Sequence, residues 1–326
     1  MDKISIVVPC YNEEEALEYF YTEMKKVMKK MKEVAFELLF VDDGSEDQTL
    51  AMLRKMAELD PRCRYLSFSR NFGKEAAIYA GLSHASGNYV AIMDADLQDP
   101  PELLPEMYQM LYWENWDCVA ARRKNREGEP RLKSFLSDCF YKVINKLSKI
   151  QLVSGARDFR MMTRRMVNGV LQMSEYNRFS KGLFQWVGFR TAWIEFPNQE
   201  RCAGKSKWPL RKLISYSLEG ITGFSVAPLS LAAVMGLLFC VISFFMIGFI
   251  AFRTLFFGDP VKGWPSMACI IFLVGGIQLF CIGILGEYLA KTYLETKRRP
   301  IYILRETSED NCKEISRGPG YERTAD

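Results

Sequence analysis

Three apolar runs of this sequence each end in a cluster of acidic or amide side chains. The runs are ISIVVP, FELLFVD and NYVAIMD, and the segments PCYNEE, DDGS and DADLQ continue them. Carboxylates gathered in one crevice repel one another unless a cation or several hydrogen-bond donors share the site. Hard oxygen ligands favour Mg²⁺ or Mn²⁺, which take one or two carboxylates together with phosphate oxygens. The residues concerned are Asn12, Glu13, Asp42, Asp43, Asp94 and Asp96.

The motif Asp94-Ala95-Asp96 places two carboxylates at a strand end, and Gln98 adds a neutral oxygen two residues later. Because the chain turns away from the strand here, both carboxylates can reach one cation. The alternative is structural: Asp96 caps the following turn, and Asp94 is a solvated strand end. The sequence has neither G-x-G-x-x-G after its first strand nor G-x-x-x-x-G-K-[ST] anywhere. A bound diphosphate would therefore need a metal to bridge it to the chain.

A sheet is needed to bring these clusters together, and the sequence predicts one. Apolar runs at 4–9, 36–42, 63–69 and 88–94 alternate with segments of helical spacing at 13–31, 49–58, 74–85 and 101–113. Strands without polar alternation that are separated by helices indicate a parallel sheet covered on both faces. We therefore expect an α/β, doubly wound domain, in which ligands bind outside the carboxyl ends of the strands.

Two stretches without a charged residue, 220–252 and 263–286, follow the α/β part. At 1.5 Å rise per residue, each can cross a hydrocarbon core about 30 Å thick. The alternative is two buried helices of a large soluble core, although soluble helices of this length need a polar face. Basic residues flank the pair at 211–212, at Lys291 and at 297–299. This bias predicts a multi-pass protein of the inner (cytoplasmic) membrane, with the α/β part and both termini in the cytoplasm.

Composition excludes several classes of protein. The 49% share of hydrophobic residues excludes a disordered chain, and a net charge of +4 is too small to indicate nucleic-acid binding. The nine cysteines are scattered singly, so neither a zinc site nor a disulfide framework is indicated. The N-terminus lacks the charged region and long apolar core of a cleavable signal peptide.

The sequence resembles the family 2 glycosyltransferases of the GT-A fold, and specifically the polyprenyl-phosphate glycosyltransferases. Undecaprenyl-phosphate glucosyltransferases of bacteria and dolichyl-phosphate mannose synthases are members of that group. The likeness extends to about Ile303 and lies in the segments VVPCYNEE, VDDGS, SRNFGKEAAIYAGLSHASGNYVAIMDADLQDPPE, ARDFRMMTRR, RCAGKSKWPLRKL and GEYLAKTYLETKRRPIY. It implies a GT-A catalytic domain, Rossmann-like with a mostly parallel sheet, followed by a two-helix transmembrane hairpin.

The resemblance implies a donor site at the strand ends. A nucleotide sugar would be bound by Pro9, Tyr11, Asn12, Glu13, Asp42 and Asp94, with the carboxylate of Asp42 accepting from the ring N–H of the base. Mg²⁺ or Mn²⁺ on the diphosphate would be held by Asp94, Asp96 and Gln98. The alternative is that 11–12 form a strand-ending turn and 42–45 a turn with a helix cap.

The resemblance also implies a lipid phosphate as the acceptor. The second pKa of such a phosphate lies near 6, so the nucleophile arrives ionised and needs cations more than a base. The catalytic candidates are Asp96, Asp158, Arg122 and Arg131. Candidates for binding the acceptor phosphate or the diphosphate are Arg201, Lys205 and Ser206. Asp158 occupies the place of a catalytic base in the wider family, and with a phosphate acceptor we expect it to orient the acceptor or the arginines. Arg122 as solvated surface charge is the alternative.

The chain divides into four predicted parts. These are a catalytic domain at 1–204, an amphipathic interfacial helix at 205–222, two membrane helices within 223–290 (about 226–252 and 264–288), and a cytoplasmic tail at 291–326. The segment WPLRKLISYSLEGI has apolar residues on one helical face, as an interfacial helix does; packing on the catalytic domain alone is the alternative. Beyond Arg305 the sequence is polar, and we expect no ordered structure there.

The predicted function is inverting transfer of a hexose to undecaprenyl or another polyprenyl phosphate on the cytoplasmic leaflet, with glucose from UDP-glucose as the first choice. Three alternatives stay open: transfer from GDP-mannose or another nucleotide sugar, a processive polysaccharide synthase, and a non-enzymatic membrane scaffold that binds nucleotide sugars. Small residues such as Gly275 and Gly276 in the spans permit close helix packing, and thus a homo-oligomer.

Overall fold

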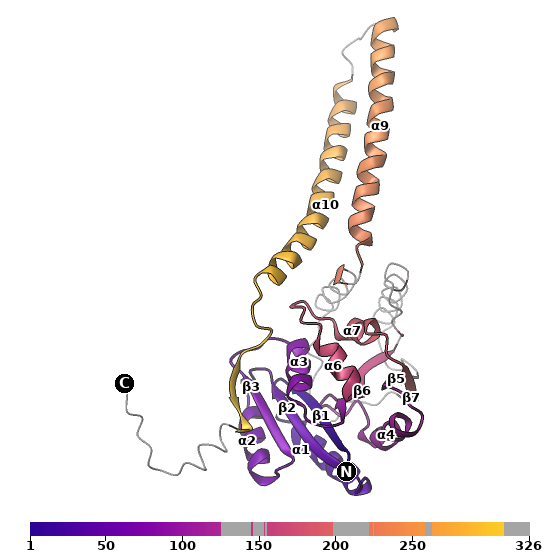
Figure 1. Cartoon of the computed structure of the whole chain (residues 1–326). Coiled ribbons are helices and arrows are strands. Elements are labelled where there is room, and N and C mark those ends of the chain that lie inside the picture. The colour runs from indigo at the N-terminus through magenta and orange to yellow at the C-terminus, as the bar shows by residue number, and fades with distance from the viewer. Residues whose placement is uncertain are drawn as a thin grey trace, which may run out of the picture.

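A computed structural model of the chain shows an α/β domain with a long two-helix hairpin on one side (Figure 1). It describes residues 1–124, 145, 153, 155–197, 222–223, 225–257 and 263–309. The predicted interfacial helix at 205–222 lies outside these residues except for its last position, and the division of the chain into four parts stays a prediction.

The domain is built on one eight-stranded sheet in the order β7-β5-β6-β4-β1-β2-β3-β8. Neighbours among β1 to β4 run parallel, as the continuous apolar runs predicted. β6 runs antiparallel between β4 and β5, and β8 runs antiparallel to β3, so the sheet is mostly parallel. The strands are β1 (Lys3–Cys10), β2 (Ala35–Asp42), β3 (Cys63–Phe68), β4 (Tyr89–Ile92), β5 (Cys118–Arg123), β6 (Ala156–Thr163), β7 (Thr191–Phe196) and β8 (Leu304–Thr307).

Helices cover both faces of the sheet. One face carries α1 (Leu17–Lys30), α2 (Thr49–Leu59) and α4 (Leu104–Trp113), and the other carries α3 (Lys74–His84), α6 (Arg164–Leu171) and α7 (Ser180–Trp186). Figure 1 shows the second group on the side of the sheet that faces the hairpin. α1 buries residues three and four positions apart, among them Leu17, Phe20 and Met24, which is the stripe that a helix on a sheet requires.

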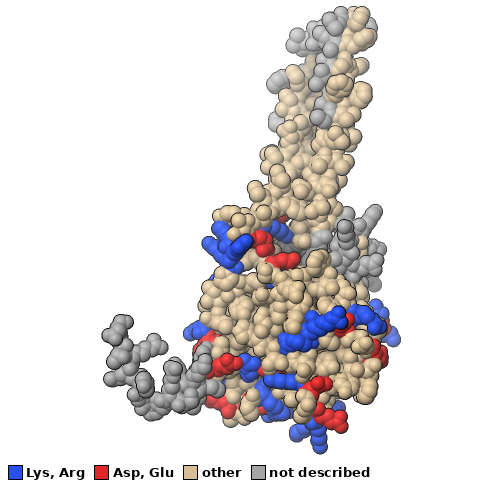
Figure 2. Space-filling model, in the orientation of Figure 1, with Lys and Arg blue, Asp and Glu red and all other residues tan. Residues whose placement is uncertain are grey.

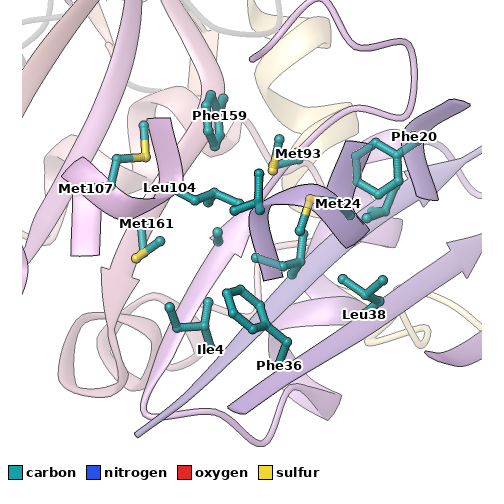
Figure 3. Packing of buried hydrophobic residues seen from close by; sticks show 14 of the residues in the cluster. Ile4, Phe20, Met24, Phe36, Leu38, Met93, Leu104, Met107, Phe159 and Met161 are labelled. Atoms are coloured by element: carbon teal, nitrogen blue, oxygen red, sulfur yellow. The ribbon is translucent and has the colours of Figure 1, made fainter. Parts of the chain in front are cut away.

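The core beneath α1 and α4 is made of large aliphatic, aromatic and methionine side chains (Figure 3). Ile4, Phe36 and Leu38 rise from the sheet toward it, while Val7 on β1 points into the core under α3. Because both faces of the strands are buried, apolar residues follow one another without polar alternation. This explains why the central strands could be recognised in the sequence.

The hairpin consists of α9 (Ala227–Phe257) and α10 (Trp264–Thr296). Within it, the segments Ala227–Met246 and Leu273–Thr296 are long and apolar enough to cross a membrane, and almost none of their residues is buried. Figure 2 shows acidic and basic side chains over the domain and the base of the hairpin, with almost none along the described part of the hairpin. Helices of a soluble core would be buried, so the hairpin supports association with a membrane.

After α10 the chain returns to the edge of the sheet as β8, which pairs with β3. The N–H of Ser69 donates to the carbonyl of Ile303 over 3.0 Å, and the guanidinium of Arg54 forms two hydrogen bonds with the carboxylate of Glu306. The expectation of no ordered structure beyond Arg305 is therefore wrong for 306–309. The order comes from pairing with a strand far away in the sequence, which local composition does not reveal.

Candidate active site

The acid-rich edge of the sheet forms because β1, β2 and β4 end there while β6 begins there. β6 runs antiparallel to β4, with Ile92 opposite Arg160. Continuing this register by two residues brings Asp94 opposite Asp158. Because β6 runs antiparallel to β4, its first residues lie beside the residues that follow β4. The segment ARDFR therefore lies beside the segment DADLQ.

Lys74, the first residue of α3, bridges these two acids. Its Nζ atom lies 2.7 Å from Oδ1 of Asp94 and 2.7 Å from Oδ2 of Asp158. Gly73 precedes the helix at φ 98°, a backbone conformation that glycine adopts without a steric penalty, and the chain turns there into α3. One ammonium group therefore neutralises part of the repulsion between two carboxylates.

The two partners hold each other in their charged forms. Burial opposes ionisation of Asp158, but the ammonium of Lys74 and the charge of Lys181 outweigh it and keep the pKa of Asp158 below its usual range. Burial likewise tends to lower the pKa of Lys74, while Asp158 and Asp94 raise it above the usual value. Asp158 is thus an ionised carboxylate with little tendency to take up a proton.

The turn after Asp94 presents oxygen atoms from a compact loop. Leu97 has φ 55°, which is uncommon for a residue with a side chain, and its side chain packs against the core under α1 and α4. The N–H of Gln98 donates to Oδ1 of Asp96 over 3.1 Å. Asp96 therefore does cap the turn through this bond. That Asp96 also binds a metal stays a prediction.

Arg157 fixes the same loop from β6. Its Nε donates to Oδ1 of Asp99 over 2.9 Å, and its Nη2 lies 3.4 Å from Oε1 of Gln98. Asp99 is fully buried, and its second oxygen, Oδ2, has no hydrogen-bond partner among the described residues. Burial raises the pKa of Asp99 to about 6, although Arg157 acts in the opposite direction. Sequence reasoning missed both residues, because an Asp before two prolines suggests only a turn.

These side chains fit a divalent metal that a diphosphate completes. Asp94, Asp96 and Gln98 offer only oxygen atoms, which is the donor set of Mg²⁺ and Mn²⁺, and Oδ2 of Asp99 adds an unpaired buried oxygen to the same loop. No group of three or more His, Cys, Asp or Glu residues in the described ranges is arranged to hold a metal by itself. Such a site would need oxygen atoms from a ligand.

The segments that follow β1 and β2 are joined by a network of hydrogen bonds. Asn12, at φ 54°, receives the N–H of Glu46 on its side-chain oxygen over 2.8 Å and donates its own N–H to Oγ of Ser45 over 2.9 Å. Both oxygens of Asp42 accept hydrogen bonds, from the N–H of Ser45 at 3.1 Å and from the hydroxyl of Ser67 at 2.8 Å.

These bonds confirm a turn at the end of each strand, while the nucleoside-binding roles of the residues there stay predictions. Carboxylate and amide oxygens have a second lone pair with which they can accept from a ligand. Pro9 is the last but one residue of β1, opposite Val41 of β2, and the half-buried Tyr11 and Glu13 follow the strand.

Asp43 ties this region to the beginning of α3. Its carboxylate accepts the N–H groups of Phe72, at 2.6 Å, and of Gly73, at 2.9 Å. Burial raises the pKa of Asp43 to about 6, against the effect of these two N–H groups. Gly44, at φ 67°, lies close to the backbone of Arg70 and Asn71, in the loop before α3.

Of the basic residues predicted for the site, only Arg122 lies among the described residues. Arg122 lies on β5, between β7 and β6, and forms a partly exposed ion pair with Glu195 of β7 at 2.5 Å. Arg131, Arg201, Lys205 and Ser206 lie outside the described residues. Lys181, which sequence reasoning missed, is half-buried on α7 and makes no ion pair within the described part of the chain, although its charge acts on Asp158.

Comparisons with known proteins agree over most of the chain. A family model described as glycosyl transferase family 2 matches residues 5–171. The SfII prophage-derived bactoprenol glucosyl transferase of Shigella flexneri is 42% identical over 310 residues, which cover 95% of this chain and 99% of that protein. The prophage bactoprenol glucosyl transferase homolog of Escherichia coli is 41% identical over 304 residues, 93% of this chain and 98% of that protein.

Among solved structures, glucosyl-3-phosphoglycerate synthase of Mycobacterium tuberculosis in complex with Mn²⁺, UDP-glucose and phosphoglyceric acid is 21% identical to this chain. The superposition has a TM-score of 0.43 and covers 68% of this chain and 78% of that chain.

Proposed function

The chain belongs to glycosyltransferase family 2, and on this premise we propose that it transfers a glucosyl residue from a nucleotide sugar to a polyprenyl phosphate at a membrane. One observation supports this function above others: a site in which Lys74 bridges Asp94 and Asp158 belongs to the same chain as an exposed apolar hairpin. A soluble acceptor would not require the hairpin. The near-full-length similarity to bactoprenol glucosyl transferases supports both the lipid acceptor and the sugar.

The proposed step is a substitution at the anomeric carbon of the sugar. An oxygen of the lipid phosphate forms a bond to that carbon from the face opposite the leaving group, and the bond to the diphosphate breaks, so the nucleoside diphosphate leaves with the electron pair. The acceptor is mostly a dianion at pH 7, because its second pKa lies near 6. No proton has to be removed, so the protein has to position two anionic groups that repel each other.

Asp158 suits an orienting role better than that of a base. The strength of a general base falls with its pKa, and the neighbouring ammonium of Lys74 keeps the pKa of Asp158 low. As a fixed negative charge, Asp158 instead holds Lys74 in place. The dianionic acceptor does not need a base, which agrees with this assignment.

A divalent metal, Mg²⁺ or Mn²⁺, would be held by Asp94, Asp96 and Gln98. When bound, it would supply positive charge that stabilises the departing diphosphate. Arg157 keeps the loop with these three residues attached to β6, through Asp99 and Gln98.

Cations on the acceptor side would attract the incoming phosphate. Among the residues that the structure describes, Lys181 of α7 is the candidate. It is half-buried, its charge lowers the pKa of Asp158, and α7 belongs to the helix layer that faces the hairpin. Arg131, Arg201, Lys205 and Ser206 stay candidates from the sequence. We place the domain in the cytoplasm and the hairpin in the inner membrane, because the basic residues flank the hairpin on the domain side.

The test is transfer of label from a panel of radiolabelled nucleotide sugars to undecaprenyl phosphate, with the full chain in membranes and with Mg²⁺, Mn²⁺ or EDTA. We expect lipid-linked label from UDP-glucose, lost with EDTA and in Asp96→Ala. Glu58→Ala, which changes an exposed carboxylate of α2, is the matched control and should keep the wild-type rate. Label from GDP-mannose alone would correct the sugar, and no lipid-linked label from any donor would contradict the function and favour a nucleotide-sugar-binding scaffold.

A further inference from the structure

The helix that carries Lys74 is held by α7 from one side. Glu75, the next residue of α3, accepts the backbone N–H of Ser180 over 2.9 Å and also the hydroxyl of Ser180. Ser180 is the first residue of α7. The position of Lys74 between Asp94 and Asp158 therefore depends on where the chain before α7 lies.

That part of the chain is bound to the hairpin. The N–H groups of Tyr176 and Asn177 both point at Oε1 of Glu295, at 2.9 and 3.4 Å. Glu295 is the last but one residue of α10, more than one hundred residues away in the sequence. A carboxylate that accepts two backbone N–H groups forms charge-assisted bonds, which are stronger than those between neutral groups.

The chain beyond α10 holds α3 at a second place. The ring of Tyr302 stacks on Phe68 of β3, with centroids 5.0 Å apart and planes inclined by 16°. The same ring contacts the edges of Tyr79 and His84, both on α3, at 6.4 and 6.2 Å. Tyr302 follows the end of α10 by six residues, so one helix end controls both contacts.

The end of α10 is itself fixed against the chain that leads into α9. The hydroxyl of Tyr288 donates to the carbonyl of Ser225 over 2.5 Å, and Nζ of Lys291 donates to the hydroxyl of Thr222. Three successive turns of α10 thus present Tyr288, Lys291 and Glu295 to partners outside the helix. The described contacts connect the hairpin to Lys74 without a gap.

We propose that the end of α10 positions the active-site lysine through α3, with Glu295 and Tyr302 as positioning residues. Neither residue lies at the acids that Lys74 bridges, and both act through the helix whose first residue is Lys74. The proposal rests on the proposed function, in that it names the residues that keep this transferase's site aligned with its membrane anchor. Its consequence is that the hairpin contributes to catalysis beyond attachment to the bilayer.

A double-mutant cycle on the full chain in lipid nanodiscs tests the proposal. Glu295→Ala should lower kcat of transfer from UDP-glucose to undecaprenyl phosphate about tenfold, and Glu295→Gln, which keeps an oxygen of the same reach, should restore much of it. Glu287→Ala removes an exposed carboxylate of the same helix that forms no hydrogen bond or ion pair within the described part of the chain, and it should have the wild-type rate.

The other single substitution of the double-mutant cycle is Lys74→Gln. If Glu295 acts through Lys74, then Glu295→Ala in the Lys74→Gln background should change kcat less than twofold, because the interaction that it supports is already lost. The same cycle is measured on the dissociation constant for UDP-glucose, so that a Lys74→Gln protein without turnover still gives a result. A tenfold effect of Glu295→Ala in both backgrounds would overturn the proposal, because the residue would then act independently of Lys74.

Amide hydrogen exchange provides the readout that does not depend on activity. Glu295→Ala should accelerate exchange at 176–177 and in the first turn of α3, at least tenfold, whereas Tyr302→Leu should do so in α3 and Tyr302→Phe should not. Unchanged exchange in α3 for both Glu295→Ala and Tyr302→Leu would refute the connection. If the wild-type chain fails to transfer sugar while the variants show these exchange changes, the proposed function is contradicted and the connection stands.

Discussion

At the scale of residues, a single lysine bridges two acids of the candidate site. Lys74 contacts two carboxylates that β4 and β6 bring face to face. The positions of Asp94 and Asp96 could be predicted, because an apolar strand ends just before them. Lys74 could not, since a lysine at the start of a helix has the pattern of an ordinary solvated charge, and its partner Asp158 lies 84 residues away.

The orienting role of Asp158 predicts a particular pH profile. Asp158→Asn should lower kcat by about 10- to 100-fold, as for loss of a positioned charge. Because the pKa of Asp158 lies below its usual range, its ionisation is complete well below neutral pH, and the wild-type kcat should not show an inflection from this group between pH 6 and 9. The measurement is kcat against pH for both proteins at saturating substrates. A wild-type inflection near neutrality that Asp158→Asn removes would establish a base instead.

Gly44 and Gly73 form a matched pair of positions with positive φ. A Cβ on Gly44 would lie 2.5 Å from the carbonyl carbon of Arg70, whereas a Cβ on Gly73 meets no atom within 4 Å. Gly73→Ala should therefore cost only the backbone strain, about 1–3 kcal/mol, and Gly44→Ala should cost more, because it also displaces the loop that Asp43 binds. Thermal unfolding of both variants gives the comparison, and equal losses would contradict it.

At the scale of elements, the strands β1 to β4 followed from the sequence, whereas β5 to β8 did not. Buried strands such as β1 and β2 are continuous apolar runs, so their periodicity identifies them. β8 is the short polar segment LRET, and its order comes from pairing with β3 and from the ion pair of Arg54 with Glu306. Likewise, nothing local in the sequence shows that β6 enters the sheet antiparallel to its neighbours.

The packing of α3 on β1 leaves no room for a side chain at Gly81. A Cβ there would lie 2.1 Å from Cγ1 of Val7. Gly81→Ala should destabilise the domain by about 1–3 kcal/mol through overpacking, and Val7→Ala in the same chain should recover part of this loss by making space. The measurement is the shift of the thermal unfolding midpoint. Ser83→Ala, on the exposed side of the helix, is the control, and an equal shift for it would contradict the packing explanation.

Buried Glu37 should make the stability of the sheet depend on acid. Burial disfavours its charged form, but hydrogen bonds from Ser5, Ser86 and Arg64 prevail and lower the pKa of Glu37 to about 2. A lowered pKa in the folded protein contributes stability that is present above the ordinary value near 4.5 and is lost as the pH falls toward 2. The contribution of Glu37 to the free energy of unfolding is at most about 3 kcal/mol.

Glu37→Gln should consequently lower the unfolding midpoint at pH 7 and flatten its fall between pH 4.5 and 2. Unfolding of the full chain in detergent, followed by near-ultraviolet circular dichroism at several pH values, provides the measurement. Glu58→Gln, an exposed carboxylate on α2, should behave as the wild type. The same acid dependence in Glu37→Gln and wild type would rule out Glu37 as its source.

At the scale of the whole molecule, the hairpin and the α/β domain have opposite surfaces. Charged side chains are spread over the domain, while the hairpin exposes large apolar ones such as Phe244 and Leu279. The basic residues on the domain side predict that the connector at 258–262 lies on the side of the membrane away from the cytoplasm, and the domain in the cytoplasm. A cysteine introduced in that connector, in a chain without native cysteines, should react with an impermeant maleimide on intact cells.

Lys55→Cys, on the exposed surface of α2, should react only after the cells are permeabilised. Reaction at position 55 on intact cells would reverse the topology and remove the site from the cytoplasmic leaflet. Both variants should first transfer sugar at the wild-type rate, since neither position is among the residues proposed for the site.

The returning strand β8 also dictates an order of synthesis. The ribosome makes β3 first, then both apolar helices, and only afterwards the strand that covers the free edge of β3. During this interval the sheet has an open edge, and such edges pair readily with other chains. If insertion of the hairpin into the membrane is delayed, the edge of β3 stays unpaired for longer. The catalytic sheet is therefore completed only after both helices of the membrane anchor have been made.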